Sequence, residues 1–249
     1  MGLTNKIIAN HALKIGKRNN TSPSNGSQTR IARARIILST GVVGIIGCLI
    51  GLLGLDRPLA EVIHSEGVDK ASVLSWVLAL LDLVSGKRFS NIAVAAGLIV
   101  IGVMGLIAWR HSIIARAALF AAVVQLTTDG IALLLKHAAG RLRPHIAMAG
   151  ADWHHVWFAG GDSFPSGHVA YYWGLLLPVA YLFPRRWALW LFVPTIVSVL
   201  RIVLDDHFLS DVGMSMILAA TACAGWGYAL RAWIGVREYT PVALVDTAE

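Results

Sequence analysis

The chain has 249 residues, of which 56% are hydrophobic and only 14% are charged, whereas about a quarter of the residues of a typical soluble domain are charged. This composition excludes an ordinary soluble domain and indicates an integral membrane protein. The net charge of +7 does not indicate a nucleic-acid partner, because no basic stripe is interleaved with aromatic residues. Cys48 and Cys223 lie within apolar segments and predict neither a disulfide framework nor a Cys-rich metal site.

Six apolar segments predict an all-α fold, an integral membrane bundle of six transmembrane helices. A helix needs about 20 mostly apolar residues to cross the bilayer core. The segments cover approximately residues 36–55, 92–109, 113–135, 169–183, 187–204 and 212–234. We therefore divide the chain into a basic N-terminal tail (1–35), a six-span domain (36–234) and a C-terminal tail (235–249).

The basic residues predict how the bundle is oriented. Seven of the 21 Lys and Arg residues precede the first apolar segment, and an excess of these residues marks the cytoplasmic side. We therefore expect both tails to be cytoplasmic. Residues 1–17 are compatible with a basic amphipathic helix on the inner leaflet or with a disordered tail, and the polar residues 18–30 predict disorder.

The loops after the first, third and fifth segments then face outward. The first outer loop contains an apolar piece, residues 71–84, which is short for a crossing. We expect this piece to lie at the membrane interface and to roof the functional site.

Asp129 is a carboxylate inside the third apolar segment. Such residues usually face the interior of the bundle and have a partner. We interpret Asp129 as part of a packing hydrogen bond or ion pair in preference to a catalytic group. A transporter or channel with Asp129 in its pathway is the alternative, although the other distinctive residues lie on one side and not at the midplane, where transporter sites lie.

Three polar clusters fall in the outward-facing loops. The first contains Lys136 and Arg143, the second is the stretch 161–168, and the third runs from Arg201 to Asp211. A phosphomonoester dianion needs fixed positive charge, for which Arg offers a planar fork and Lys a point charge. We therefore expect the three cations to bind a phosphoryl group and not merely to snorkel to the interface.

The stretch 161–168, GDSFPSGH, directly precedes an apolar run. Its composition predicts a helix N-terminus with Asp162 or Ser163 as the cap and Pro165 in the first turn. Unpaired amides at such a terminus attract anions, phosphate above all.

His207 and Asp211 are four residues apart, which places them on one face of a helix. A carboxylate bonded to one ring nitrogen fixes the tautomer and leaves the other nitrogen free to react. Arg201 would point away from His207 on an unbroken helix. The spacing therefore predicts a break between them, with Asp205 or Asp206 capping a new helix and His207 in its first turn.

Together the three clusters resemble the signature of the type 2 phosphatidic acid phosphatase superfamily of membrane lipid phosphatases. That signature is Lys-x6-Arg-Pro, then Pro-Ser-Gly-His, then Ser-Arg-x5-His-x3-Asp. The chain matches every core position in order, which disfavours a catalytically inactive scaffold. It departs at Leu200, where the family often has Ser, and Ser198 is out of register. This departure puts substrate preference in question more than activity.

The resemblance implies a metal-independent phosphatase or diphosphatase that needs no cofactor and forms a phosphohistidine. It implies that His207 is the nucleophile, that Asp211 orients it, and that His168 protonates the leaving oxygen and later activates water. The phosphoryl group would be held by Lys136, Arg143, Ser166, the Gly167 amide and Arg201. Four further histidines, His137, His145, His154 and His155, lack the spacing and the carboxylates of a metal site.

The expected function is therefore removal of phosphate from a membrane lipid at the outer face of a plasma (bacterial inner) membrane. The candidate substrates are undecaprenyl diphosphate, a lipid A phosphate, phosphatidylglycerol phosphate and phosphatidic acid. The sequence does not choose among these lipids and does not predict the oligomeric state.

Overall fold

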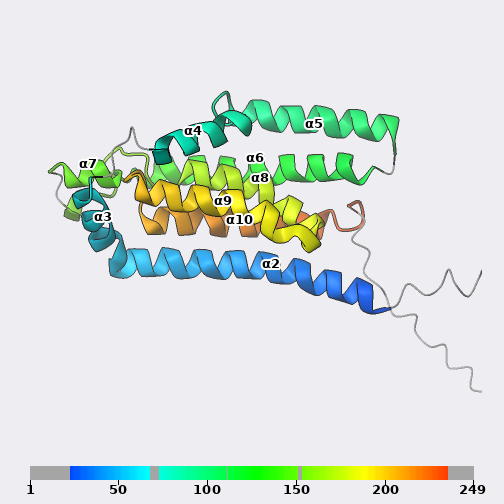
Figure 1. The fold of residues 1–249 in the computed structure, drawn as a ribbon, viewed down its shortest axis with the longest axis horizontal. Coiled ribbons are helices and arrows are strands. Elements are labelled where there is room, and N and C mark those ends of the chain that lie inside the picture. The colour runs from blue at the N-terminus through cyan, green and yellow to red at the C-terminus, as the bar shows by residue number, and fades with distance from the viewer. Residues whose placement is uncertain (1–22, 68–72, 111, 151–152, 235–249) are drawn as a thin grey trace, which may run out of the picture.

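The computed structural model describes residues 23–67, 73–110, 112–150 and 153–234, and within these ranges it contains helices and no strands. The predicted all-α fold is therefore confirmed (Figure 1). The α-helices are α2 (Pro23–Ile50), α3 (Asp56–Ser65), α4 (Val73–Val84), α5 (Asn91–Ala108), α6 (Ile113–Ala139), α7 (Pro144–Met148), α8 (Gly167–Leu182), α9 (Trp187–Val203) and α10 (Leu209–Ala229). A π-helix, η1 (Gly51–Leu55), joins α2 to α3, and the short 3₁₀-helices are η2 (Trp153–His155) and η3 (Pro184–Arg186).

The six long helices α2, α5, α6, α8, α9 and α10 lie at the six predicted apolar segments. In the described part of the chain, four helical segments are both long and apolar enough to cross a membrane: Ser27–Ser65, Ile113–Met148, Pro184–Val203 and Leu209–Ala229. Helices α5 and α8 are shorter than these four segments. The fold therefore has the character of a membrane protein, and the count of six crossings stays a prediction.

The first helix begins earlier than the sequence indicated. Residues 23–30 are helical, so the prediction of disorder over residues 18–30 is wrong for this part. Further along the same helix, Arg33 donates a hydrogen bond from Nε to the Tyr181 carbonyl at 3.0 Å and lies over the Tyr181 ring. The predicted alternatives for residues 1–17 lie outside the described residues.

Helix α8 is the centre of the bundle and packs against α6, α9 and α10. Its side chains Val169, Tyr171, Tyr172 and Leu177 are at most 1% exposed. Leu177 belongs to the main core, and Tyr171 and Tyr172 belong to a second cluster between α8 and α9. The second polar cluster, residues 161–168, ends in the first turn of α8. The packing of α8 in the core therefore fixes the position of that cluster.

Helices α2 and α10 approach each other closely through glycines. A Cβ on Gly213 would come within 2.4 Å of the Cys48 amide nitrogen, and one on Gly44 would come within 2.8 Å of the Gly213 carbonyl oxygen. Small residues at helix contacts allow such close packing in membrane proteins. The contact brings the end of α2, and with it α3, against the first turn of α10.

The polar clusters gather at one end of the bundle. The last turns of α6 and α9 and the first turns of α8 and α10 meet there, and α3 and α7 cover this end (Figure 1). Helix α6 stops at Gly140, whose left-handed conformation (φ 52°) ends the helix. The chain between α6 and α8 then folds back on itself through hydrogen bonds such as Leu142 to Val156 and Ser163 to Arg141.

Candidate active site

The connection between α9 and α10 positions His207. Helix α9 ends at Val203, and Asp205 adopts a left-handed conformation (φ 57°) that turns the chain. The His207 amide then donates a hydrogen bond to the Arg201 carbonyl at 3.0 Å. The predicted break between Arg201 and His207 is therefore confirmed.

The predicted cap of the new helix is wrong. Phe208 is the N-cap of α10, and its amide donates to the Asp211 carboxylate at 2.9 Å. His207 therefore precedes the helix and is not in its first turn. Asp205 and Asp206 belong to the turn that precedes the helix, so neither is its N-cap. The Asp211 side chain instead accepts the hydrogen bond from the N-cap amide.

His207 is buried, with 2% of its surface exposed. Its Nδ1 atom lies 3.5 Å from Oδ2 of Asp211 and 3.5 Å from Oγ of Ser163. The Ser163 hydroxyl donates to the same Asp211 oxygen at 2.5 Å. With Nδ1 facing the carboxylate, Nε2 is the ring nitrogen left to react. Burial lowers the pKa of His207 to about 4, against the opposing effect of Asp211, so the imidazole is neutral at pH 7.

Arg141 forms a buried network that holds Asp211. The side chain is 3% exposed; its Nη1 donates to Asp211 at 2.6 Å and to Ser210 at 2.7 Å. Its Nη2 donates to Asp56, the first residue of α3, at 2.7 Å. The guanidinium lies over the rings of both Trp157 and Phe208. This arrangement keeps Asp211 ionised and fixed beside His207.

The three predicted phosphate-binding cations converge at the same end. Arg143 forms a bidentate pair with Asp162, with both contacts at 2.8 Å, and Lys136 donates to the Asp162 carbonyl oxygen. Arg143 also lies 3.6 Å from Asp206, and Arg201 lies 2.8 Å from the same carboxylate. The Arg143 guanidinium holds the pKa of Asp162 at about 2. Lys136, Arg143 and Arg201 therefore gather around the Asp162 and Asp206 residues at this end of the bundle.

The Pro165 to His168 stretch begins α8 differently from the prediction. Helix α8 starts at Gly167 with Ser166 as its N-cap, so the proposed caps Asp162 and Ser163 are wrong. Their side chains are instead held by Arg143 and Asp211. The Ser166 hydroxyl is fully buried and has no hydrogen-bond partner among the described residues. A Cβ built on Gly167 meets nothing within 4 Å, so open space adjoins this residue.

His168 points toward α4. Its Nε2 atom lies 3.0 Å from Oδ2 of Asp82. A cavity of about 210 Å³ lies between α4 and the bundle, lined by His168, Arg201 and Asp206 together with Leu78 and Asp82. Helix α4 therefore lies over this cavity, and its position at the membrane interface stays a prediction.

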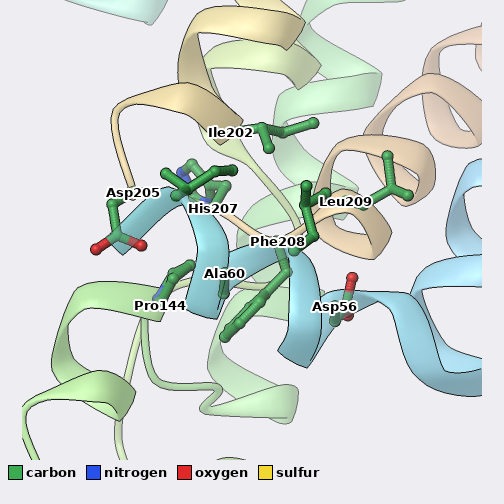
Figure 2. Close-up of a pocket in the computed structure, with 10 residues that line it drawn as sticks. Asp56, Ala60, Pro144, Ile202, Asp205, His207, Phe208 and Leu209 are labelled. Carbon is green, nitrogen blue, oxygen red and sulfur yellow. The ribbon is translucent and has the colours of Figure 1, made fainter. Parts of the chain in front are cut away.

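A second cavity is lined by His207, which is not among the residues that line the larger cavity. Figure 2 shows it between Asp56 and Ala60 of α3, Pro144 of α7, and the α9–α10 connection. Its volume is about 10 Å³, close to the least space that a single water needs. The larger cavity is therefore the one with room for a phosphoryl group.

Other polar residues singled out in the sequence have structural partners. Asp129 accepts a hydrogen bond from Gln125 at 2.6 Å, which confirms the packing interpretation. Ser198 bonds to Trp173 and to the Pro194 carbonyl, so it does not replace the hydroxyl missing at Leu200. His145 bonds to the Asp205 carbonyl. Among the described residues no group of three or more potential metal ligands occurs, and metal independence stays a prediction.

Four site residues were not identified from the sequence as parts of the site: Asp56, Asp82, Arg141 and Asp206. Asp56 and Asp82 follow or interrupt apolar stretches, where a carboxylate usually has a partner. Arg141 lies two residues before Arg143, on the side of the loop that turns into the protein. The positions of these residues indicated weakly that they have partners. The sequence did not identify the partners, because these are distant along the chain.

Comparison with known proteins gives one match. Residues 114–234 match the family model described as PAP2 superfamily. This segment contains all three polar clusters, whereas α2 to α5 precede it. No match was found among the curated proteins or among the solved structures.

Proposed function

Since residues 114–234 make this chain a member of the PAP2 superfamily, whose members are phosphatases, we propose that it removes phosphate from a membrane lipid through a phosphohistidine at His207. One observation carries the proposal. Arg143 and Arg201 share the Asp206 carboxylate directly beside His207, and the cavity that contains Arg201 also contains His168. His168, Arg201 and Asp206 therefore line one cavity, and His207 follows Asp206 directly in the chain.

The phosphoryl group binds where hydrogen-bond donors have no partner within the described part of the chain. Nε of Arg201 and the Ser166 hydroxyl are buried and have no partner within the described part of the chain. The open space beside Gly167 allows an oxygen to approach the first amides of α8. The phosphate competes with Asp162 and Asp206 for Arg143 and Arg201, and it gains charge-assisted hydrogen bonds in return.

The reaction proceeds in two displacements. Nε2 of His207 attacks phosphorus as the bond to the lipid oxygen breaks, and His168 donates a proton to that oxygen. Neutral His168 then takes a proton from water, whose oxygen attacks phosphorus and breaks the P–N bond. Inorganic phosphate leaves and His207 is regenerated. Asp211 stabilises the charge on His207 while the phosphohistidine exists.

The surroundings of the site favour a lipid substrate. The outer face of α4 is apolar, with Val73, Trp76 and Leu80 each at least 60% exposed. Such a face suits the membrane interface, and the cavity beneath it takes a headgroup while the tail stays in the bilayer. With the N-terminus cytoplasmic, the site faces the exterior or periplasm of a plasma membrane. The candidates are undecaprenyl diphosphate, a lipid A phosphate, phosphatidylglycerol phosphate and phosphatidic acid.

Phosphate release from these four lipids by the purified protein tests the proposal. We expect release from at least one lipid in the presence of a chelator, and a loss of at least about 1000-fold in His207→Ala, in line with the large losses seen when a catalytic nucleophile is removed. Unchanged activity in both His207→Ala and His168→Ala would refute the mechanism. Activity that a chelator abolishes would refute the metal-free reaction.

A further inference from the structure

Asp82 lies outside the segment that matches the family, on a helix that reaches the site from the other half of the chain. Helix α4 packs on α9, and Leu78 is buried against Tyr172, Leu200 and Leu204. This packing places Asp82, one turn after Leu78, against the first turn of α8. The position of Asp82 is therefore set by the core of the bundle and not by a free loop.

Both oxygens of Asp82 accept hydrogen bonds from one face of α8. Oδ2 lies 3.0 Å from Nε2 of His168, and Oδ1 accepts the Tyr172 hydroxyl at 3.0 Å. His168 and Tyr172 are four residues apart and so share a helix face. The Tyr172 oxygen also bonds to Ser85 at 2.8 Å, just after the end of α4. The carboxylate is thus fixed in orientation as well as in position.

The charges around His168 give this contact a chemical consequence. Burial lowers the pKa of His168, the positive charges of Arg201 and Lys87 lower it further, and the hydrogen bond and charge of Asp82 oppose this lowering. Burial would raise the pKa of Asp82, but its hydrogen bonds with His168 and Tyr172 and the charge of Lys87 hold it below the ordinary value. Asp82 is therefore a carboxylate at neutral pH.

We infer that Asp82 is the positioning residue of the general acid: it binds Nε2–H of His168 and leaves Nδ1 to exchange the proton with the leaving oxygen and then with water. The form of His168 that is protonated on both nitrogens enters the first step, gives up the Nδ1 proton to the lipid oxygen, and keeps Nε2–H on Asp82. In the second step Nδ1 recovers a proton from water. This inference rests on the proposed role of His168.

The choice of leaving group distinguishes a role of Asp82 in proton transfer from a merely structural role. A nitrophenolate leaves without a proton, whereas an alkoxide needs one. We therefore compare kcat/KM for a long-chain alkyl phosphate and for a nitrophenyl phosphate with an alkyl tail of the same length. Because kcat/KM reports only the steps up to leaving-group departure, the later activation of water by His168 does not enter.

For Asp82→Asn we expect kcat/KM on the alkyl phosphate to fall by about 10- to 100-fold, a large part of what a general acid contributes, with a change below about 3-fold on the nitrophenyl phosphate. Tyr172→Phe keeps the carboxylate but releases one of its oxygens, so it should show the same selectivity with a smaller loss. Glu61→Gln is the matched control, because Glu61 pairs with Arg57 on the surface of α3, and it should leave both substrates unaffected.

Equal losses on both substrates in Asp82→Asn and Tyr172→Phe would overturn the inference, and so would no loss on either substrate. His168→Ala separates this failure from a failure of the proposed function. If His168→Ala spares the nitrophenyl phosphate and Asp82→Asn does not, only the role of Asp82 is wrong. If His168→Ala shows no selectivity itself, the general-acid role falls and the inference falls with it.

Discussion

Replacing Arg141 by Met tests whether a buried ionic network holds the site. Arg141 is 3% exposed, and its guanidinium donates to Asp211 at 2.6 Å, to Ser210 at 2.7 Å and to Asp56 at 2.7 Å. A methionine side chain keeps most of the volume but leaves two buried carboxylates without their cation. Removing one partner of a buried ion pair costs about 3–5 kcal/mol.

Thermal unfolding of the protein in detergent measures this cost. For a chain of this size, about 1 kcal/mol corresponds to about 2–4 °C, so Arg141→Met should lower the Tm by about 6–20 °C. Arg57→Met is the matched control, because Arg57 is an exposed arginine in a surface pair with Glu61. Such pairs contribute about 0–1 kcal/mol, so the Tm of this variant should fall by no more than a few degrees.

A double-mutant cycle with Asp56→Asn separates the network from simple packing. In the Arg141→Met variant the Asp56 charge has lost its cation, so adding Asp56→Asn should destabilise that variant less than it destabilises the wild-type chain. A coupling of about 1–3 kcal/mol is typical of residues in one network. Additive effects, or an Arg141→Met variant as stable as Arg57→Met, would refute the reasoning.

Three further changes have defined outcomes. Because burial lowers the pKa of His207 from 6.5 to about 4, the unfolded chain binds a proton that the native chain lacks between these values, and stability should fall as pH falls from 6.5 to 4. His207→Gln should flatten the dependence of Tm on pH in that window, and an unchanged slope would contradict the assignment. Gly167→Ala should have the Tm of the unmodified protein, since the new Cβ meets nothing within 4 Å. Its KM for the lipid phosphate should rise at least about 10-fold, because one displaced hydrogen bond to a charged group costs about 1.5–3 kcal/mol. An unchanged KM would show that the phosphate does not bind beside Gly167. Asp206→Asn removes a negative charge between Arg143 and Arg201, so inorganic phosphate should inhibit about 5- to 30-fold more strongly, equivalent to about 1–2 kcal/mol. Weaker inhibition would mean that Asp206 serves to align the arginines.

Much of this fold was predictable because hydrophobicity determines it directly. The apolar segments correspond to α2, α5, α6, α8, α9 and α10, since a continuous apolar stretch leaves the chain few choices other than a helix in the bundle. The gathering of Lys136, Arg143, His168, Arg201 and His207 at one end of the bundle was predictable, because helix ends that alternate between two sides bring alternate loops together.

The predictions of helix caps were wrong because the side chains concerned make contacts with distant residues. Ser163 and Asp162 have the residue types of helix caps, yet Asp211 and Arg143 bind them instead. Asp205 looked like a cap but adopts a left-handed turn. In each case a local preference worth about 1 kcal/mol gave way to stronger charge-assisted hydrogen bonds from elsewhere in the chain.

The pairing of Asp56 with Arg141 and of Asp82 with His168 was not predictable from spacing. The partners are separated by 85 and 86 residues, and they meet because α3 and α4 fold over the end of the bundle. Only the presence of carboxylates next to apolar stretches indicated that partners exist.

Trapping the covalent intermediate tests the catalytic assignment most directly. The protein is mixed with a lipid phosphate that carries a radiolabelled phosphoryl group and quenched in alkali, and the labelled peptide is mapped. We predict an alkali-stable, acid-labile label on His207, which persists longer in His168→Ala and is absent in His207→Ala. Label that remains in His207→Ala, or maps to another residue, would contradict the assignment of His207 as the nucleophile.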